Sequence, residues 1–439
     1  MTNLAYVLEQ TPYQSYVYAY PHKTTYRVLD HPVPLSAAWA EERRDALFLY
    51  IHIPFCEMRC GFCNLFTTVN PKGDIESRYL DTLERQARRA RAALGSASFA
   101  RLAIGGGTPT YLKPGDLHRL FDIAEQIFGA DPQAIPVSVE TSPKTADNAR
   151  LSALRERGVD RISIGVQSFF EEEAAAAGRP QTTAAVEAAL ERIRALGFPT
   201  LNIDLIYGIG GQTVESWLES LRAALRYQPE ELYLYPLYVR PLTGLGRQGR
   251  AWDDIRLACY RAGRDFLLDH GYQQVSMRMF RAPHAPALDG PVYCCQEDGM
   301  VGLGCGARSY TRRLHYSSEY AVGASGVRAI LQDYIARDDA SFDSAHYGYM
   351  LTDEDIRRRY LIQSLLQANG LDRMAYHTRF ASDALADLPQ LDELVEHGLA
   401  TLTNERLLLT ESGMGRSDMI GPWLYTTQVQ TLMEAYILR

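Results

Sequence analysis

Short apolar runs alternate with longer amphipathic stretches between residues 47 and 237. The run LFLYIHI at 47–53 is apolar and β-branched, which predicts a buried strand, and residues 74–94 predict a helix with a charged outer face. Strands and helices in alternation indicate parallel pairing through right-handed crossovers. We therefore expect an α/β fold built on a partial, open (βα)6 barrel of the TIM type. The other predicted strands lie at 99–104, 136–141, 160–165, 200–206 and 232–237, with helices around 114–128, 145–157, 181–196 and 212–227.

The pattern changes after this barrel. Residues 281–350 are less regular, with clusters of Pro, Gly and Tyr, whereas 354–368 and 386–398 are predicted to be helical. The stretch GLATLTNERLLLT at 398–410 predicts a hairpin around Asn404–Glu405, and helices followed by a hairpin favour a small winged-helix-like domain that packs over the barrel mouth. The expected parts are an N-terminal arm at 1–44, the core at 45–280, an extension at 281–350 and the C-terminal domain at 351–439.

The composition is that of a globular protein, since 46% of the 439 residues are hydrophobic and 22% are charged. The net charge of −8 and the lack of a basic recognition helix argue against a nucleic-acid partner. No apolar run approaches the ~20 residues needed to span a membrane. The N-terminus has no basic run followed by an apolar core, so no secretory signal is expected. Seven cysteines in such a chain favour a reducing cytoplasm and metal or redox chemistry over disulfides.

Three of the seven cysteines lie within eight positions, directly after the first strand. Cys56, Cys60 and Cys63 have the spacing C-x3-C-x2-C, which brings three sulfurs together at the C-terminal end of a barrel strand. Three thiolates can hold three irons of a [4Fe–4S] cluster, whose usual complement is four cysteines, and leave one iron open to another ligand. Three buried thiols or half of a zinc site are the alternatives. Core thiols rather than spare ligands are expected at Cys294, Cys295 and Cys305.

The segment around these cysteines resembles the radical S-adenosylmethionine (SAM) superfamily and, within it, the HemN-like family of coproporphyrinogen III oxidase-like proteins. Tyr50 opens the family's Y-x-H-I-P-F-C segment, Phe62 stands between the last two cysteines as a family aromatic does, and GGGTPT at 105–110 follows the second strand. The resemblance implies that SAM chelates the open iron. It also implies that one electron, from a donor such as flavodoxin or ferredoxin, yields a 5′-deoxyadenosyl radical.

The resemblance further implies which residues contact the cofactors. Cys56, Cys60 and Cys63 would ligate the metal, and Tyr50 would be both catalytic and cofactor-binding. A glycine-rich turn lets backbone N–H groups approach a ligand, carboxylates suit ribose hydroxyls and an ammonium, and arginine suits a carboxylate. The other implied cofactor contacts are Phe62, Gly106, Gly107, Thr108, Glu140, Gln167, Arg179 and Asp204.

Three departures separate the chain from the known branches of this family. Leu65 occupies the place of a further cysteine in the oxidases, and Arg308 stands where the oxidase has an apolar residue, whereas the extended N-terminus is unlike that of HemW-like heme chaperones. The resemblance implies a tetrapyrrole or related substrate, changed by oxidative decarboxylation or methyl transfer. A HemW-type heme carrier and a structural metalloprotein are the alternatives. Candidate partners for tetrapyrrole propionates, or else solvated side chains, are His22, Lys23, Arg27, Arg308, Arg312 and Arg313.

Overall fold

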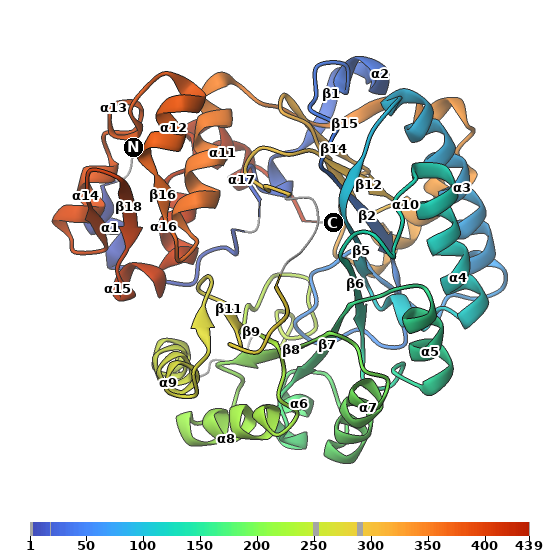
Figure 1. Ribbon diagram of the computed structural model, residues 1–439, viewed down its shortest axis with the longest axis horizontal. Coiled ribbons are helices and arrows are strands. Elements are labelled where there is room, and N and C mark those ends of the chain that lie inside the picture. Colours follow the sequence, from blue (N-terminus) through green and yellow to red (C-terminus); the bar gives the residue numbers. More distant parts are fainter. Residues whose placement is uncertain (1–2, 18, 249–253, 288–292, 439) are drawn as a thin grey trace.

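A computed structural model describes residues 3–17, 19–248, 254–287 and 293–438. Six parallel strands form the centre of its largest sheet and run in the order in which they occur in the chain. The strip of parallel strands curves without closing (Figure 1), as expected for an open barrel. The six predicted strands are confirmed as β2 (Leu47–Ile53), β5 (Phe99–Gly106), β6 (Val137–Thr141), β7 (Arg161–Gln167), β8 (Thr200–Tyr207) and β9 (Glu231–Pro236).

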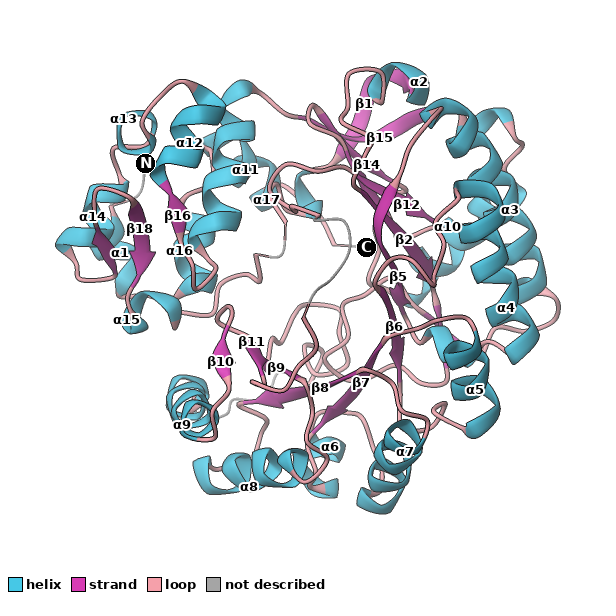
Figure 2. Ribbon diagram, viewed as in Figure 1, coloured by secondary structure: helices cyan, strands magenta, loops and turns pink. Residues whose placement is uncertain are grey.

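Helices cover the outer face of this curved sheet (Figure 2). The predicted helices form within a few residues of their expected limits, and α6 and α9 are additions that the sequence analysis did not predict. Among the described residues, no helix is long and apolar enough to cross a membrane. The outer helices are α3 (Ile75–Leu94), α4 (Pro114–Asp122), α5 (Asn148–Glu156), α6 (Glu171–Ala176), α7 (Thr183–Ala195), α8 (Val214–Leu225) and α9 (Arg256–Asp269).

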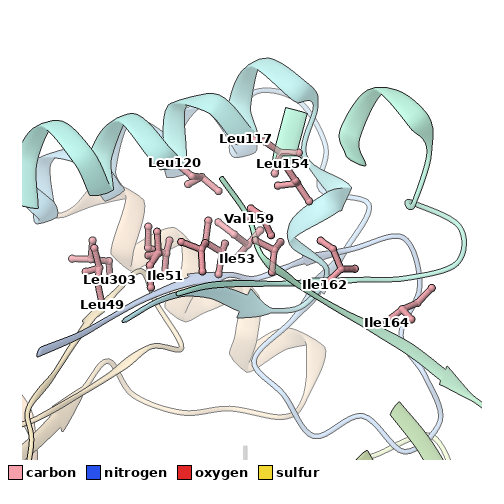
Figure 3. Packing of buried hydrophobic residues seen from close by; sticks show 14 of the residues in the cluster. Leu49, Ile51, Ile53, Leu117, Leu120, Leu154, Val159, Ile162, Ile164 and Leu303 are labelled. Atoms are coloured by element: carbon pink, nitrogen blue, oxygen red, sulfur yellow. The ribbon is translucent and has the colours of Figure 1, made fainter. Parts of the chain in front are cut away.

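The core lies between the outer face of the sheet and these helices. Leu49, Ile51 and Ile53 alternate along β2 and are fully buried, because successive strand residues point to opposite faces. They lie in one apolar layer with Leu117 and Leu120 of α4 (Figure 3). Burying one such side chain stabilises the folded protein by about 1.5–3 kcal/mol. The layer therefore holds the strands in place against the helices, and this fixes the position at which each strand ends.

The extension at 281–350 is more regular than predicted. β12 (Met300–Leu303) pairs in parallel with β2 and is followed by α10 (Ala324–Ala336) and antiparallel strands. The sequence missed these strands because each is short and gains its stability from a partner distant in the chain. The added strands at the β2 side are β13 (Arg308–Tyr310), β14 (Leu314–Ser317), β15 (Ser344–Met350) and β1 (Arg27–Pro34), and those at the β9 side are β11 (Met279–Arg281) and β10 (Gln273–Gln274).

The C-terminal residues form helices around a three-stranded sheet, with a second hydrophobic core that also takes in residues of the N-terminal arm. The hairpin predicted around Asn404–Glu405 is confirmed, but the helix predicted at 386–398 is broken. Leu388 precedes Pro389 and has an extended φ of −133°, as residues before proline prefer. The elements are α1 (Leu4–Leu8), η1 (Lys23–Thr25), α11 (Asp353–Leu365), β16 (Leu371–Asp372), α12 (Arg373–Phe380), α13 (Ala384–Asp387), α14 (Leu391–Glu396), β17 (Ala400–Leu402), β18 (Arg406–Leu409), α15 (Glu411–Met414), α16 (Ser417–Trp423) and α17 (Thr427–Glu434). The short helix α2 (Leu35–Ala38) packs instead against α3 and β1, on the side of the large sheet.

A buried ion pair joins the large sheet to this C-terminal unit. Arg278, just before β11, donates to Asp418 on α16, and the two side chains are 5% and 1% exposed. The Tyr238 hydroxyl also donates to Asp418, and the Arg278 guanidinium lies 3.9 Å from the ring centroid of Tyr16 in the N-terminal arm. Three distant parts of the chain therefore meet at one charge pair.

Replacing one partner of this pair is expected to destabilise the protein strongly. Asp418→Asn leaves the Arg278 guanidinium buried without its carboxylate, which costs about 3–5 kcal/mol of unfolding free energy. Chemical denaturation of the purified variant measures the loss. Arg222→Ala, which removes an exposed pair with Glu219, is the control and should cost less than about 1 kcal/mol. Equal losses in the two variants would contradict this account.

Candidate cofactor and substrate cavity

A cavity of about 740 Å³ lies at the C-terminal ends of the parallel strands. Side chains and turns from the ends of β5, β6, β7, β8 and β9 line it, together with the cysteine loop and segments from both ends of the chain. It brings together eleven of the twelve site residues predicted from the sequence. These are Cys56, Cys60, Cys63, Phe62, Gly106, Gly107, Thr108, Glu140, Gln167, Arg179 and Asp204.

The cysteine loop is held closed by backbone hydrogen bonds. β3 (Phe55–Cys56) pairs in parallel with β4 (Thr68–Val69), which ties the two ends of the loop together. In its middle, the Gly61 N–H lies 3.1 Å from the carbonyls of Ala177 and Gly178, and a Cβ at Gly61 would fall 2.7 Å from the Ala177 oxygen. Only glycine fits this approach, so the loop is fixed against the segment after α6.

The glycine turn after β5 lies directly against the first cysteine. Gly107 N–H donates to the Ile53 carbonyl at 2.7 Å, and Thr108 N–H donates to the Phe55 carbonyl at 2.8 Å. A Cβ at Gly107 would lie 2.9 Å from the Cys56 sulfur, and the Thr108 hydroxyl is 3.5 Å from that sulfur. The turn is therefore shaped to the position of Cys56.

Burial governs the protonation of these thiols. It raises the pKa of Cys56 to about 12 and that of Cys60 to about 11, so both are protonated in the metal-free protein. Iron binding would remove these protons, because a coordinating thiol is deprotonated. In the part of the chain that the structure describes, no three His, Cys, Asp or Glu side chains are grouped around the position of a single metal ion.

Two carboxylates form an acidic region of the cavity. Glu140 on β6 is open to the cavity and accepts from the Gly106 N–H at 3.0 Å, and enclosure by the surrounding protein raises its pKa to about 7. Asp204 on β8 accepts from Asn202 at 2.8 Å, and burial raises its pKa to about 6. Gly105 is needed here, since a Cβ would lie 2.9 Å from a Glu140 oxygen. Ligand cations would lower both pKa values by favouring the ionised carboxylates.

Gln167 and Arg179 meet above the end of β7. The pairing with β8 shifts register between Gly165 and Gln167, and Gln167 has a φ of +69°, a conformation that costs energy in a non-glycine residue. A Cβ at Gly165 would lie 2.6 Å from the Gln167 amide nitrogen and 3.0 Å from an Arg179 nitrogen. The bulge and the glycine together aim both side chains into the cavity.

Tyr50 differs from the expectation, because it does not line the main cavity. It lines an adjoining chamber of about 100 Å³, which shares Gly106 and Glu140 with the main cavity. Tyr50 lies near the middle of β2, before the strand reaches the cysteine loop, and this position places it one layer below the cofactor-facing residues. Its hydroxyl is 3.2 Å from Nδ1 of His52, a chamber residue that the sequence reasoning missed although it belongs to the Y-x-H segment.

A basic group lines another part of the cavity. His22, Lys23 and Arg308 lie on the cavity, as expected for propionate partners, and Arg240 joins them from the loop after β9. No sequence signal pointed to Arg240, because it belongs to no motif. Three other candidates do not line the cavity: Arg27 donates to main-chain carbonyls, Arg312 is exposed, and Arg313 pairs with Asp353 at 2.6 Å. The cavity is completed by Met433, Tyr436 and Leu438 from the C-terminal segment.

The remaining cysteines are only partly as expected. Cys305 is buried in the core, but Cys294 is half-buried and Cys295 is exposed. The prediction of a core thiol was therefore wrong for Cys295. The Cys294 N–H donates to the Asp298 carboxylate at 2.6 Å and so closes a turn. This turn directs Cys295 outward.

The chain is similar to known proteins of one superfamily. A family model of the radical SAM superfamily matches residues 50–224. The chain is 28% identical over 434 residues to the oxygen-independent coproporphyrinogen III oxidase of Salmonella typhimurium, covering 91% of each protein. It is 27% identical over 371 residues to the heme chaperone HemW of Bacillus subtilis, covering 83% of this chain and 95% of that protein. The solved structure of coproporphyrinogen III oxidase from Escherichia coli covers 100% of this chain and 99% of its own, with a TM-score of 0.76 and 24% identity.

The cysteine loop, the glycine turn and the family match define a radical SAM protein. Within that superfamily, the chain is similar to HemN-like proteins over most of its length, and it shares the fold of one of them. Its cofactors are a [4Fe–4S] cluster and SAM. The donor set fits them, since three free thiols line one cavity with a glycine turn, two carboxylates and an arginine.

The closeness of Gly107 to Cys56 leads to a test by cluster loading. In Gly107→Ala, the added methyl group would meet the Phe55 carbonyl at 2.5 Å and must push the cysteine loop away, so we expect most of the bound iron to be lost after anaerobic reconstitution. Iron analysis and cluster absorbance measure this. Gly115→Ala is the matched control, because no atom lies within 4 Å of its added Cβ. Full iron content in Gly107→Ala would show that the turn does not constrain the loop.

The raised carboxyl pKa values lead to a test by pH. Glu140 and Asp204 gain charge as the pH rises through about 7 and about 6, and SAM carries a sulfonium and an ammonium, so SAM affinity should increase between about pH 5.5 and about pH 8. Glu140→Gln should flatten this increase, leaving the part due to Asp204. Calorimetry on cluster-loaded protein measures the affinities, with the exposed Glu172→Gln as control. The same pH dependence in Glu140→Gln and wild type would exclude Glu140 from SAM binding.

Proposed function

We propose that the protein is a radical SAM enzyme that acts on a tetrapyrrole or a closely related substrate, by oxidative decarboxylation or methyl transfer. The observation that carries this proposal is one cavity of about 740 Å³ that holds the cysteine trio, the glycine turn and the two carboxylates, and also extends to a basic and aromatic wall. Its volume lies in the upper part of the range of about 300–1,000 Å³ seen for ligand sites.

Each cofactor-facing group has a distinct part in the proposal. Cys56, Cys60 and Cys63 hold the cluster, which when bound supplies the electron for reductive cleavage of SAM to methionine and a 5′-deoxyadenosyl radical. The glycine turn offers its N–H groups to SAM, and Glu140 and Asp204 bind the ribose hydroxyls or the ammonium. The SAM carboxylate is assigned to Arg179. The remaining contacts are assigned to Phe62, Thr108, Gln167 and, from the adjoining chamber, Tyr50.

The aromatic lining favours a flat conjugated substrate. Among the described residues, five tyrosine rings line the cavity in addition to the cofactor residues. They come from the N-terminal arm, β9 with its following loop, the extension and the C-terminal segment. Faces and edges of aromatic rings pack against another π system in offset or edge-to-face arrangements, as a tetrapyrrole would require. These residues are Tyr16, Tyr235, Tyr238, Tyr320 and Tyr436.

Heme carriage without turnover is the second candidate. It is favoured by the match to the heme chaperone HemW, of which the chain covers 95%, and by Leu65, which lines the cavity at the place of the oxidases' further cysteine. A carrier would use the same aromatic and basic wall but would not couple ligand binding to SAM cleavage. Either protein would work in a reducing cytoplasm, where the three thiols stay free.

An anaerobic turnover assay separates the two candidates. The reconstituted protein is given SAM and dithionite, with and without coproporphyrinogen III or heme, and 5′-deoxyadenosine is quantified. We expect product in the wild type, none in Cys60→Ala, and wild-type levels in the control Cys295→Ala, whose thiol is exposed and away from the cavity. Stoichiometric heme binding by a protein with an intact cluster and no 5′-deoxyadenosine would overturn the enzyme in favour of the carrier.

A further inference from the structure

We propose that Arg161, in the barrel interior below the cavity, is a positioning residue for SAM, because its guanidinium lies beneath the two carboxylates that face the ligand. Arg161 does not line the cavity itself, so it acts through Glu140 and Asp204. The inference rests on the proposed function, in which these two carboxylates bind SAM. It adds a residue that sets the pH range in which the acidic region attracts a cationic ligand.

The register of the parallel strands places Arg161 one layer below the cavity. Between β6 and β7, Ser138 pairs with Arg161, and Glu140 pairs with Ser163. Residues two apart on a strand point to the same face, and Ser163 lines the cavity together with Glu140. Arg161 therefore points to the inner face of the barrel, in the layer beneath Glu140 and Ser163.

Contacts on two sides hold the Arg161 guanidinium inside the barrel. Nη1 donates to the Ser138 hydroxyl on β6 at 2.9 Å, and Nε donates to the Glu231 carboxylate on β9 at 2.7 Å. The guanidinium also lies 5.8 Å from the ring centroid of Tyr233 on β9. Because β8 lies between β7 and β9 in the sheet, the side chain reaches past the strand that carries Asp204 (Figure 1). Its positive charge is thus shared by the layer below both carboxylates.

Two polar side chains connect Asp204 to this layer. The Asn202 amide donates to the Ser163 hydroxyl and to Asp204 Oδ1, both at 2.8 Å, and the Ser163 hydroxyl donates to Asp204 Oδ2 at 3.3 Å. Asn202 is fully buried. Hydrogen bonds donated to a carboxylate favour its charged form, so these contacts orient Asp204 and act in the same direction as the charge of Arg161.

The charge of Arg161 opposes the effect of burial on both carboxylates. Burial is the first cause that raises the pKa of Glu140 to about 7 and that of Asp204 to about 6, whereas the Arg161 charge lowers both pKa values. The charge of Asp204 also raises the pKa of Glu140. Without Arg161, this repulsion would favour protonation at neutral pH, and the region would attract the sulfonium and ammonium of SAM less strongly.

Other titratable groups surround the two carboxylates, but on different sides. Arg179 lowers the pKa of Asp204, although the proposed function assigns its charge to the SAM carboxylate. Tyr233 and Tyr235 face Asp204 from β9, and burial raises the pKa of both phenols, which keeps them neutral. Arg161 is distinct because it acts from beneath the carboxylates, opposite the ligand. The titratable groups that share the adjoining chamber with Glu140 are Lys23, Tyr50, His52, Arg308 and Glu319.

The pH dependence of SAM binding tests this role. Calorimetry on the cluster-loaded protein measures SAM affinity between about pH 5.5 and about pH 9. In Arg161→Gln, we expect the increase of affinity with pH to move upward by about one pH unit, so that binding is weaker at about pH 7 and recovers at about pH 9. Arg161→Lys, which keeps the charge, should retain the wild-type profile. Arg222→Gln, which removes an exposed pair with Glu219, is the control.

Glu231→Gln is the opposing variant, because it breaks the same ion pair from the other side. It leaves the charge of Arg161 without its counter-charge, so the increase of SAM affinity should move to lower pH. A defect in packing would weaken binding at every pH in both variants. Opposite displacements in the two variants would therefore support an electrostatic role of Arg161.

The outcomes separate this role from lost packing and from the proposed function. Weaker binding at every pH in Arg161→Gln, or a profile that does not move, would overturn the role. If Arg161→Gln does not fold, Glu231→Gln decides, and a profile that fails to move to lower pH would overturn the role. Wild-type protein that forms no 5′-deoxyadenosine, with the two variants displaced in opposite directions, would refute the enzymatic function and leave the role of Arg161 standing.

Discussion

The close approach of the glycine turn after β5 to the cysteine loop after β2 is the constraint on which the site depends. The N–H groups of Gly107 and Thr108 donate to the carbonyls of Ile53 and Phe55, which extends the pairing of two parallel strands past their ends. Two loops that would otherwise move independently are joined at this point. Side chains are excluded from the junction, because a Cβ at Gly107 would meet both backbone and the Cys56 sulfur. The position of the cysteines is therefore set by the register of the sheet.

The register in turn depends on the apolar layer beneath it, and the remaining walls of the cavity depend on contacts between distant segments. β2 and β5 are held by buried aliphatic side chains against α3 and α4, so their ends are fixed before any ligand binds. The substrate side has no such support within the barrel. It is assembled from both ends of the chain and from the extension: the extension joins the sheet through the pairing of β12 with β2, and the C-terminal unit is attached through the buried pair of Arg278 and Asp418. The two halves of the cavity thus differ in how they are stabilised.

This difference explains how much could be predicted from the sequence. The six central strands follow from local patterns, and eleven of the site residues were implied by the family resemblance. Most of them meet in one cavity because the C-terminal ends of neighbouring parallel strands share one edge. Arg240 could not be predicted, since its place depends on the contact of its loop with Gln14. Arg312 and Arg313 do not line the cavity, because the turn between β13 and β14 directs them outward. The positive charge of these residues does not indicate the direction in which the turn points. The short strands of the extension were missed for the same reason, as their partners are remote.

The chamber around Tyr50 shows how a buried histidine can set the hydrogen-bonding role of its neighbour. Burial lowers the pKa of His52 to about 4, so the ring is neutral and carries one proton. Nε2 lies 3.0 Å from the Phe66 carbonyl, which can only accept, so the proton is on Nε2. Nδ1 is then an acceptor, and the Tyr50 hydroxyl at 3.2 Å donates to it. The hydrogen bond from His52 to the Phe66 carbonyl therefore fixes which of the two side chains donates in the Tyr50–His52 pair.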